Sequence, residues 1–294
     1  MPQLSNRVGT FTDSVIRRMT RISDAYGAIN LSQGFPDFDP PKEIMDALAK
    51  AAYQGPHQYS VTYGAPNFRQ ALAKKQGKTI NREIDPEKEI VVTCGGTEAM
   101  MCAMMTICNP GDKVVVFSPF YENYGADTIL SGAEPIYVPL VPPEFHFDKE
   151  KLEDAFRQGA KALILCNPSN PCGKVFTMEE MQTIAELAKK YDAYVVTDEV
   201  YEHIVYAPYK HIYMQSLEGM RERTIVCNSL SKTYSITGWR LGYACGPAEI
   251  IKQMIKLHQY AIMCAPTNSQ FAAVEALRNC DTEVEKMVTA YDQR

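Results

Sequence analysis

Continuous aliphatic runs, rather than alternating ones, mark the predicted strands of this chain. Five runs of strand length stand out, at residues 89–93, 113–117, 161–166, 193–197 and 224–228. Such runs are typical of strands that are buried on both faces of a parallel sheet. A further run at 241–245 is predicted to be the antiparallel strand of a mixed sheet.

Helical spacing of apolar residues appears before, between and after these runs. It predicts helices at 42–52, 67–76, 99–107 and 178–191, and others that start at 248, 267 and 282. Thr177, with Glu180 three positions later, matches a capping box that would start the helix at 178. Strands that alternate with helices indicate a doubly wound α/β fold. We therefore predict a mostly parallel, seven-stranded sheet flanked by helices.

Composition narrows the class of protein. The 294 residues are 46% hydrophobic and 22% charged, with a net charge of −5 and no block of Lys or Arg, which argues against nucleic acid as a partner. No apolar run approaches the ~18 residues of a membrane span. Nine cysteines are scattered without a C-x-x-C pair, so we expect a reducing, cytoplasmic location. With only five dispersed histidines, no metal site is expected.

Chemically distinctive residues follow the five strand runs. Lys232 lies in Ser229-Leu230-Ser231-Lys232, directly after a buried run. A lysine is usually a solvated surface charge, but a desolvated one can form a Schiff base with a cofactor aldehyde. Arg240, eight positions on, could grip a phosphate through two hydrogen bonds, and Ser229 could donate a third. Together they point to pyridoxal phosphate as the cofactor.

Asp198 follows the run at 193–197, where a carboxylate needs a partner. The pyridine nitrogen of pyridoxal phosphate is one such partner, because an aspartate there keeps the ring protonated. Tyr201, one helical turn along, could reach the 3-hydroxyl oxygen of the ring. The alternative role for Asp198 is the N-cap of a helix, and the two roles are compatible.

Three further segments could complete such a site. Gly96 and Thr97 lie between a strand and a helix, where free N–H groups bind phosphate, although glycine-rich turns are common at such junctions. Asn170 lies in a segment that its composition marks as a turn, and its amide could donate to the 3-oxygen of the ring. Tyr121 could stack on the pyridine face or be a core aromatic.

These segments, and Asn30–Pro36 near the N-terminus, resemble the class I/II aminotransferases of the fold-type I pyridoxal phosphate enzymes over nearly the whole chain. The resemblance implies that Lys232 is both the Schiff-base lysine and the 1,3-proton shuttle. It places Asp198 on the pyridinium, with Asn170 and Tyr201 on the phenolic oxygen. The other implied roles are Tyr121 on the ring; Gly96, Thr97, Ser229 and Arg240 around the phosphate; Tyr59 on the neighbouring subunit's phosphate; and Gly34 at the substrate carboxylate site.

The resemblance also implies a division of the chain. Residues 1–45 would be an N-terminal arm with part of a small domain, 46–280 the large cofactor-binding domain, and 281–294 the start of an interdomain helix. In family members the remainder of the small domain carries the arginine for the substrate carboxylate, and it would lie beyond Arg294.

We therefore expect an aminotransferase that moves an amino group between an L-amino acid, such as an aspartate, aromatic or related donor, and a 2-oxo acid. A homodimer with shared active sites is implied by Tyr59. A carbon–sulfur β-lyase on the same fold and a catalytically idle fragment that binds pyridoxal phosphate are the alternatives.

Overall fold

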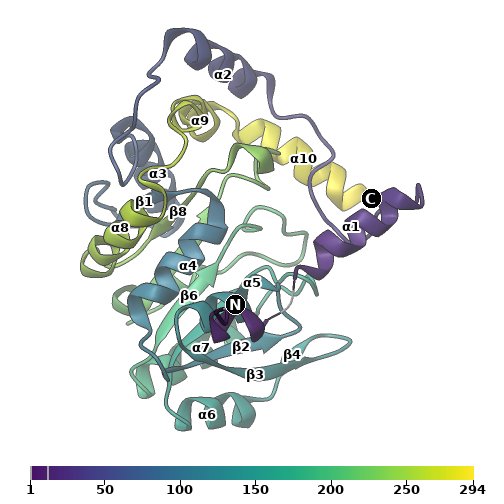
Figure 1. Ribbon diagram of the computed structural model, residues 1–294, viewed down its shortest axis with the longest axis vertical. Helices are drawn as coiled ribbons and strands as arrows, with labels where there is room; N and C mark the ends of the chain where they lie inside the picture. Colours follow the sequence, from purple (N-terminus) through teal and green to yellow (C-terminus); the bar gives the residue numbers. More distant parts are fainter. Residues whose placement is uncertain (1, 12) are drawn as a thin grey trace.

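The computed structural model describes residues 2–11 and 13–294, which form three layers with a mixed sheet between two layers of helices (Figure 1). The strands run in the order β1-β8-β7-β6-β5-β2-β3-β4. Their bounds are β1 Ile90–Thr93, β2 Lys113–Ser118, β3 Glu134–Val141, β4 His146–Phe147, β5 Ala160–Cys166, β6 Tyr194–Asp198, β7 Thr224–Ser229 and β8 Gly242–Cys245.

Strand direction agrees with the sequence analysis. β2 pairs in parallel with β3 and β5, β5 with β6, and β6 with β7. β8 is antiparallel to both of its neighbours, β1 and β7, as predicted for the run at 241–245. All five principal runs form strands, displaced by at most one residue at either end.

The prediction of seven strands was wrong, because the sheet has eight. The additional edge strand, β4, is only two residues long and pairs antiparallel with the end of β3. The ring of Phe147 in this strand packs against that of Phe117, with the ring centroids 5.3 Å apart. A strand of two residues has no periodicity that a sequence pattern can reveal.

Each face of the sheet has its own covering of helices. Val91, Val116, Ile164, Val196 and Ile225 face a layer made by α4, α5 and α8. The opposite side chains face α6 and α7 at one end of the sheet, and α3 and α9 at the other. The helices are α1 Val15–Ala25, α2 Lys42–Gln54, α3 Pro66–Thr79, α4 Gly95–Ile107, α5 Asn123–Leu130, α6 Lys149–Arg157, α7 Met178–Lys190, α8 Ala248–Ile262, α9 Thr267–Asn279 and α10 Asp281–Gln293.

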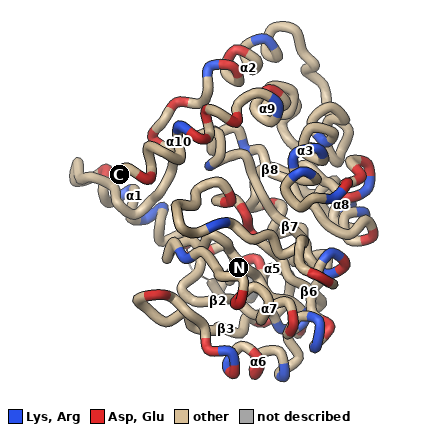
Figure 2. Tube along the Cα trace, turned by 180° about the vertical axis from the view of Figure 1, so that it is seen from behind, with Lys and Arg blue, Asp and Glu red and all other residues tan. Residues whose placement is uncertain are grey.

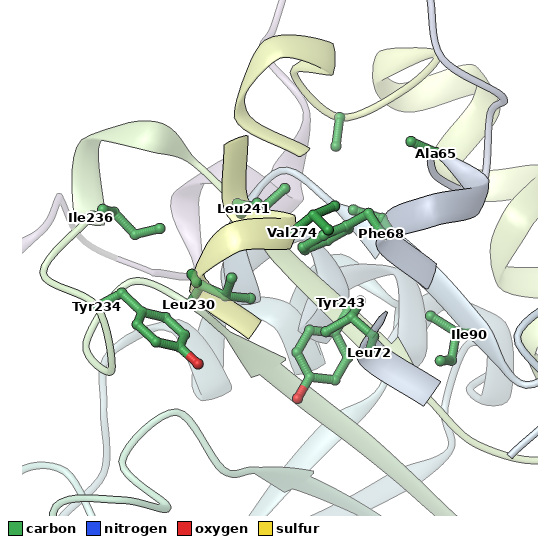
Figure 3. Close-up of a cluster of buried hydrophobic side chains, with 14 of the residues drawn as sticks. Ala65, Phe68, Leu72, Ile90, Leu230, Tyr234, Ile236, Leu241, Tyr243 and Val274 are labelled. Carbon is green, nitrogen blue, oxygen red and sulfur yellow. The ribbon is translucent and has the colours of Figure 1, made fainter. Parts of the chain in front are cut away.

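Figure 3 shows the core at the β1–β8 end, where Phe68 from α3, Val274 from α9 and Leu241 before β8 converge. Phe68 and Leu241 are fully buried. The removal of such side chains from water is the main stabilising contribution to this part of the fold. The cluster also includes Leu230 and Tyr234, so the turn that carries Lys232 is anchored in the core on both sides.

The predicted capping box is confirmed. The Thr177 side chain accepts a hydrogen bond from the Glu180 backbone, and the Glu180 carboxylate accepts one from the Thr177 backbone. Acidic and basic residues are mixed along α6 and α8 (Figure 2), the pattern of solvated helix surfaces. None of the helices in the described part of the chain is long and apolar enough to span a membrane.

Candidate active site

The predicted functional residues gather at the carboxyl ends of the parallel strands. In the register of the sheet, Asp198 at the end of β6 lies between Cys166 of β5 and Cys227 of β7. The Asn170 loop follows β5, and the Lys232 turn follows β7. In open α/β sheets this edge is where ligands bind.

Lys232 lies in a tight turn, three residues after β7. Its Nζ donates a hydrogen bond to the backbone oxygen of Gly34, at 2.9 Å. Burial lowers the pKa of this amine, and the nearby Asp198 carboxylate opposes that shift. A lowered pKa increases the fraction of the neutral amine, which is the nucleophilic form.

Asp198 is held by two donors. The Tyr124 hydroxyl donates to its Oδ2 at 2.7 Å, and the Val200 N–H donates to Oδ1 at 3.2 Å. Burial raises the pKa of the carboxyl, and these two hydrogen bonds act in the opposite direction. A bound cation would therefore stabilise the ionised carboxylate considerably.

Two local predictions about this segment were wrong. Residues 200–203 form turns rather than a helix, so Asp198 is not a helix N-cap and Tyr201 is not one helical turn along. The chain turns here because Asp198 accepts from the N–H two residues on, which favours an Asx turn over a helix. Tyr201 still faces the same site. Burial raises the pKa of its hydroxyl, and a hydrogen bond with the Asn170 side chain opposes this.

Tyr121 stands at the edge of this cluster. Its ring meets that of Tyr124 edge-on, with centroids 5.8 Å apart. Burial raises the pKa of its hydroxyl, Asp198 adds to the increase, and Arg240 opposes it. Tyr121 thus lies within electrostatic reach of both the predicted ring site and the predicted phosphate site.

The predicted phosphate site is a turn at the start of α4. The helix begins at Gly95, and Gly96 lies close to β7, since an added Cβ there would be 3.8 Å from the Ser229 Cβ. Arg240 Nη2 donates to the Cys94 oxygen at 3.4 Å. Thr97 is exposed in the first helical turn, where backbone N–H groups remain free. The turn therefore combines a guanidinium, a serine hydroxyl and a helix N-terminus.

Gly95→Ala is expected to weaken phosphate binding at this turn at least about tenfold. Gly95 has φ +80°, and an added Cβ would collide with the Arg240 guanidinium. The measurement is the dissociation constant of inorganic phosphate. Gly111→Ala is the control, because Gly111 has φ +85° with open space around it. Equal affinity in the two variants would show that the Gly95 turn does not hold the anion.

Tyr124 and Asp127 were missed by the sequence analysis. Both lie on α5 and face the end of β6, so the only available signal was their spacing after Tyr121. Asp127 is buried, and within the described residues its Oδ2 has no hydrogen-bond partner. Burial, with a smaller contribution from Asp198, raises the pKa of Asp127 to about 7.

Asp127→Asn is expected to stabilise the cofactor-free protein at pH 8 but not at pH 4. Because the pKa of this carboxyl is higher in the folded than in the unfolded state, the folded protein loses stability as pH rises from about 4 to about 7. The full cost, on the order of 4 kcal/mol, applies above that range. Urea unfolding of both proteins at the two pH values measures it. A stability difference that does not change with pH would contradict this ionisation.

Gly34 and Tyr59, whose roles only the resemblance implied, lie in different surroundings. Gly34 contacts Lys232 through its backbone oxygen, so it joins the cluster. The Tyr59 side chain is 79% exposed on the segment before α3. Its role at a neighbouring subunit stays a prediction.

Comparison with known proteins agrees with this geometry. Residues 26–294 match the family model described as aminotransferase class I and II. The chain is 37% identical over 283 residues to kynurenine–oxoglutarate transaminase 3 of Rattus norvegicus, covering 92% of this chain and 62% of the relative, less than two thirds of its length. It is also 37% identical to an aspartate aminotransferase of Pyrococcus abyssi, covering 99% of this chain and 76% of that one. The chain belongs to the class I and II aminotransferases.

Solved structures of this aminotransferase family share the fold. The structure of N-succinyldiaminopimelate aminotransferase from Mycobacterium tuberculosis superposes with a TM-score of 0.95 at 35% identity, over 99% of this chain and 76% of that chain. The α/β architecture described above is thus that of fold-type I aminotransferases.

Class I and II aminotransferases use pyridoxal phosphate, and the side chains at this site fit that group. Burial raises the pKa of the Asp198 carboxyl, so a further cationic partner such as a protonated ring nitrogen would stabilise its ionised form. The turn at Gly95 offers guanidinium, hydroxyl and N–H donors for a dianion, and Lys232 offers an amine for an aldehyde. Asn170 and Tyr201 offer an amide and a hydroxyl beside them.

Proposed function

We propose that the protein transfers an amino group between an L-amino acid and a 2-oxo acid, with pyridoxal phosphate held on Lys232. The observation that carries the proposal is the half-buried Lys232 amine, which donates to the Gly34 oxygen at 2.9 Å and has its pKa lowered by burial, within electrostatic reach of Asp198 at one sheet edge. Aspartate, aromatic and kynurenine-like donors are the substrate classes to which we assign it. The acceptor is a 2-oxo acid.

In this proposal each residue has a distinct task. Asp198, kept in place by Tyr124, stabilises the protonated pyridine nitrogen, while Asn170 and Tyr201 bind the 3-oxygen. Tyr121 stacks on the ring, and Gly96, Thr97, Ser229 and Arg240 hold the phosphate. Bound pyridoxal phosphate supplies an electron sink for the pair left at the substrate Cα.

Lys232 performs the proton transfer in this proposal. Lys232 would hold the cofactor through its aldehyde, and its Nζ, as a free amine, would accept and return the proton that leaves the substrate Cα. General acid–base catalysis at such close range contributes about 10²–10⁴-fold to a rate. The backbone oxygen of Gly34, 2.9 Å from Nζ, would orient the amine. In this proposal Gly34 also lines the substrate carboxylate site.

A half-reaction tests this proposal. Purified protein loaded with pyridoxal phosphate is mixed with single amino acids, and formation of pyridoxamine phosphate and the 2-oxo acid is quantified. Stoichiometric conversion with at least one donor, reversed by an added 2-oxo acid, is the expected result. Pyruvate released from cystathionine without an acceptor would indicate a β-lyase instead. Bound cofactor that reacts with no donor would indicate an idle binding protein.

The assembly and location are part of the same proposal. We propose a homodimer in which Tyr59 reaches the neighbouring subunit's phosphate, supported by its 79% exposure. A cytoplasmic location is supported by nine cysteines that are all free thiols. We further propose residues 46–280 as the large domain, 1–45 as arm and small-domain portion, and 281–294 as the start of the interdomain helix. Specific activity that falls when the protein is diluted would support active sites shared between two subunits through Tyr59.

A further inference from the structure

Beneath the candidate phosphate site lies a carboxylate–imidazole pair that has no role in the proposed chemistry. Glu98 is the fourth residue of α4, and its Oε2 accepts a hydrogen bond from the Cys94 N–H at 2.5 Å. Arg240 holds the oxygen of the same residue. The Cys94 side chain itself makes no capping hydrogen bond, and the Glu98 carboxylate accepts the Cys94 N–H instead.

His258 contacts the other oxygen of this carboxylate. It lies on α8, is fully buried, and its Nδ1 is 2.7 Å from Glu98 Oε1. Its Nε2 is 2.8 Å from the backbone oxygen of Thr62. A carbonyl oxygen only accepts, so Nε2 carries a proton, and a second proton is shared between Nδ1 and the carboxylate. The pair as a whole is therefore neutral.

This neutrality matters because of where Glu98 lies. A carboxylate in the first turn of a helix interacts favourably with the positive end of the helix dipole, but it also repels an anion bound at the same N-terminus. The proton on His258 cancels that repulsion without removing the hydrogen bond to Cys94. The bond from Nε2 to Thr62 also ties the segment that carries Tyr59 to the phosphate turn.

We propose that Glu98 and His258 are a positioning pair for the cofactor phosphate, in which the carboxylate fixes the turn at Cys94 and the imidazole neutralises the carboxylate. The proposal rests on the proposed function only in that the anion is a cofactor phosphate. It predicts an asymmetry between the two residues, because removal of His258 leaves a buried negative charge near the anion whereas removal of the Glu98 charge does not.

The test compares His258→Gln, Glu98→Gln and the double variant in their affinity for inorganic phosphate. Trp239 is the sole tryptophan and precedes Arg240, so its fluorescence reports binding to cofactor-free protein. We expect His258→Gln to weaken binding at least about tenfold and Glu98→Gln about threefold. Addition of Glu98→Gln to His258→Gln should restore the affinity to that of Glu98→Gln alone. A merely structural role would give no such rescue.

A matched control is His146→Gln, which breaks a pair of the same kind, with His146 Nδ1 2.8 Å from Glu180 Oε1, on an exposed surface. It should leave phosphate affinity unchanged. Equal affinity in all variants, or a double variant as weak as His258→Gln, would overturn the proposal. So would a wild type that binds no phosphate.

Where His258→Gln does not fold, Glu98→Ala provides a second measurement. Hydrogen exchange at the Cys94 amide should accelerate at least about tenfold, because its acceptor is lost. Unchanged exchange would refute the role of Glu98. These readouts do not involve Lys232, so a failure of the proposed function would show separately, as wild type that binds phosphate but does not attach pyridoxal phosphate.

Discussion

Lys232→Ala is expected to lower kcat/KM for amino-group transfer by at least about 10⁴-fold, while the folded structure is retained. The variant lacks both the amine that anchors the cofactor and the base that moves the Cα proton. The fold should tolerate the change, because a half-buried lysine whose pKa burial lowers contributes little to stability. Steady-state kinetics with the best donor, beside circular dichroism, measures both quantities.

The control for Lys232 is Lys252→Ala. Lys252 is an exposed lysine of α8 whose Nζ lies 3.9 Å from the exposed Glu249 carboxylate, so activity should be unchanged. Retention of more than about a tenth of the wild-type rate in Lys232→Ala would mean that another group performs the proton transfer.

Asp198→Asn is expected to reduce the rate about 10²–10³-fold and, without cofactor, to stabilise the protein at neutral pH. The rate falls because an amide cannot neutralise a protonated ring nitrogen. Stability rises because the pKa of Asp198 is raised by burial, so its ionised form costs folding energy as pH rises through that pKa. Kinetics and thermal unfolding of the cofactor-free form provide the two measurements.

Tyr124→Phe is the matched variant for Asp198. It removes the 2.7 Å hydrogen bond but keeps the carboxylate, so its rate loss should be smaller, about tenfold. If Asp198→Asn lost both activity and stability in the cofactor-free form, burial of the carboxyl would not be the cause of its raised pKa.

The sequence was sufficient to predict the parts of the fold that local patterns encode. Runs buried on both faces became β1, β2, β5, β6 and β7, and the antiparallel β8 was also predicted. Because the ends of parallel strands share one edge of a sheet, the strand pattern, the chemistry of the residues after each strand and the family resemblance together assigned residues from Gly96 to Arg240 to one site. The strands β3 and β4 at one end of the sheet were not predicted, since the second half of β3 alternates between buried and exposed positions and β4 has two residues.

What the sequence could not supply were contacts between distant segments. The Tyr124 hydroxyl donates to Asp198, which lies 74 residues later in the sequence. The Glu98 carboxylate contacts His258, which lies 160 residues later. No spacing rule connects such pairs, because they meet only once α5 and α8 pack on the sheet. The turn after Asp198 likewise escaped prediction, because a short polar residue at that point is compatible with both a helix N-cap and an Asx turn.

The attachment of the cofactor to Lys232 is tested by reducing the pyridoxal phosphate-loaded protein with borohydride, digesting it, and mapping the modified peptide by mass spectrometry. We predict one phosphopyridoxyl group per chain, on the Nζ of Lys232. An adduct on a different lysine, or none on correctly folded protein, would contradict this attachment and the chemistry that depends on it.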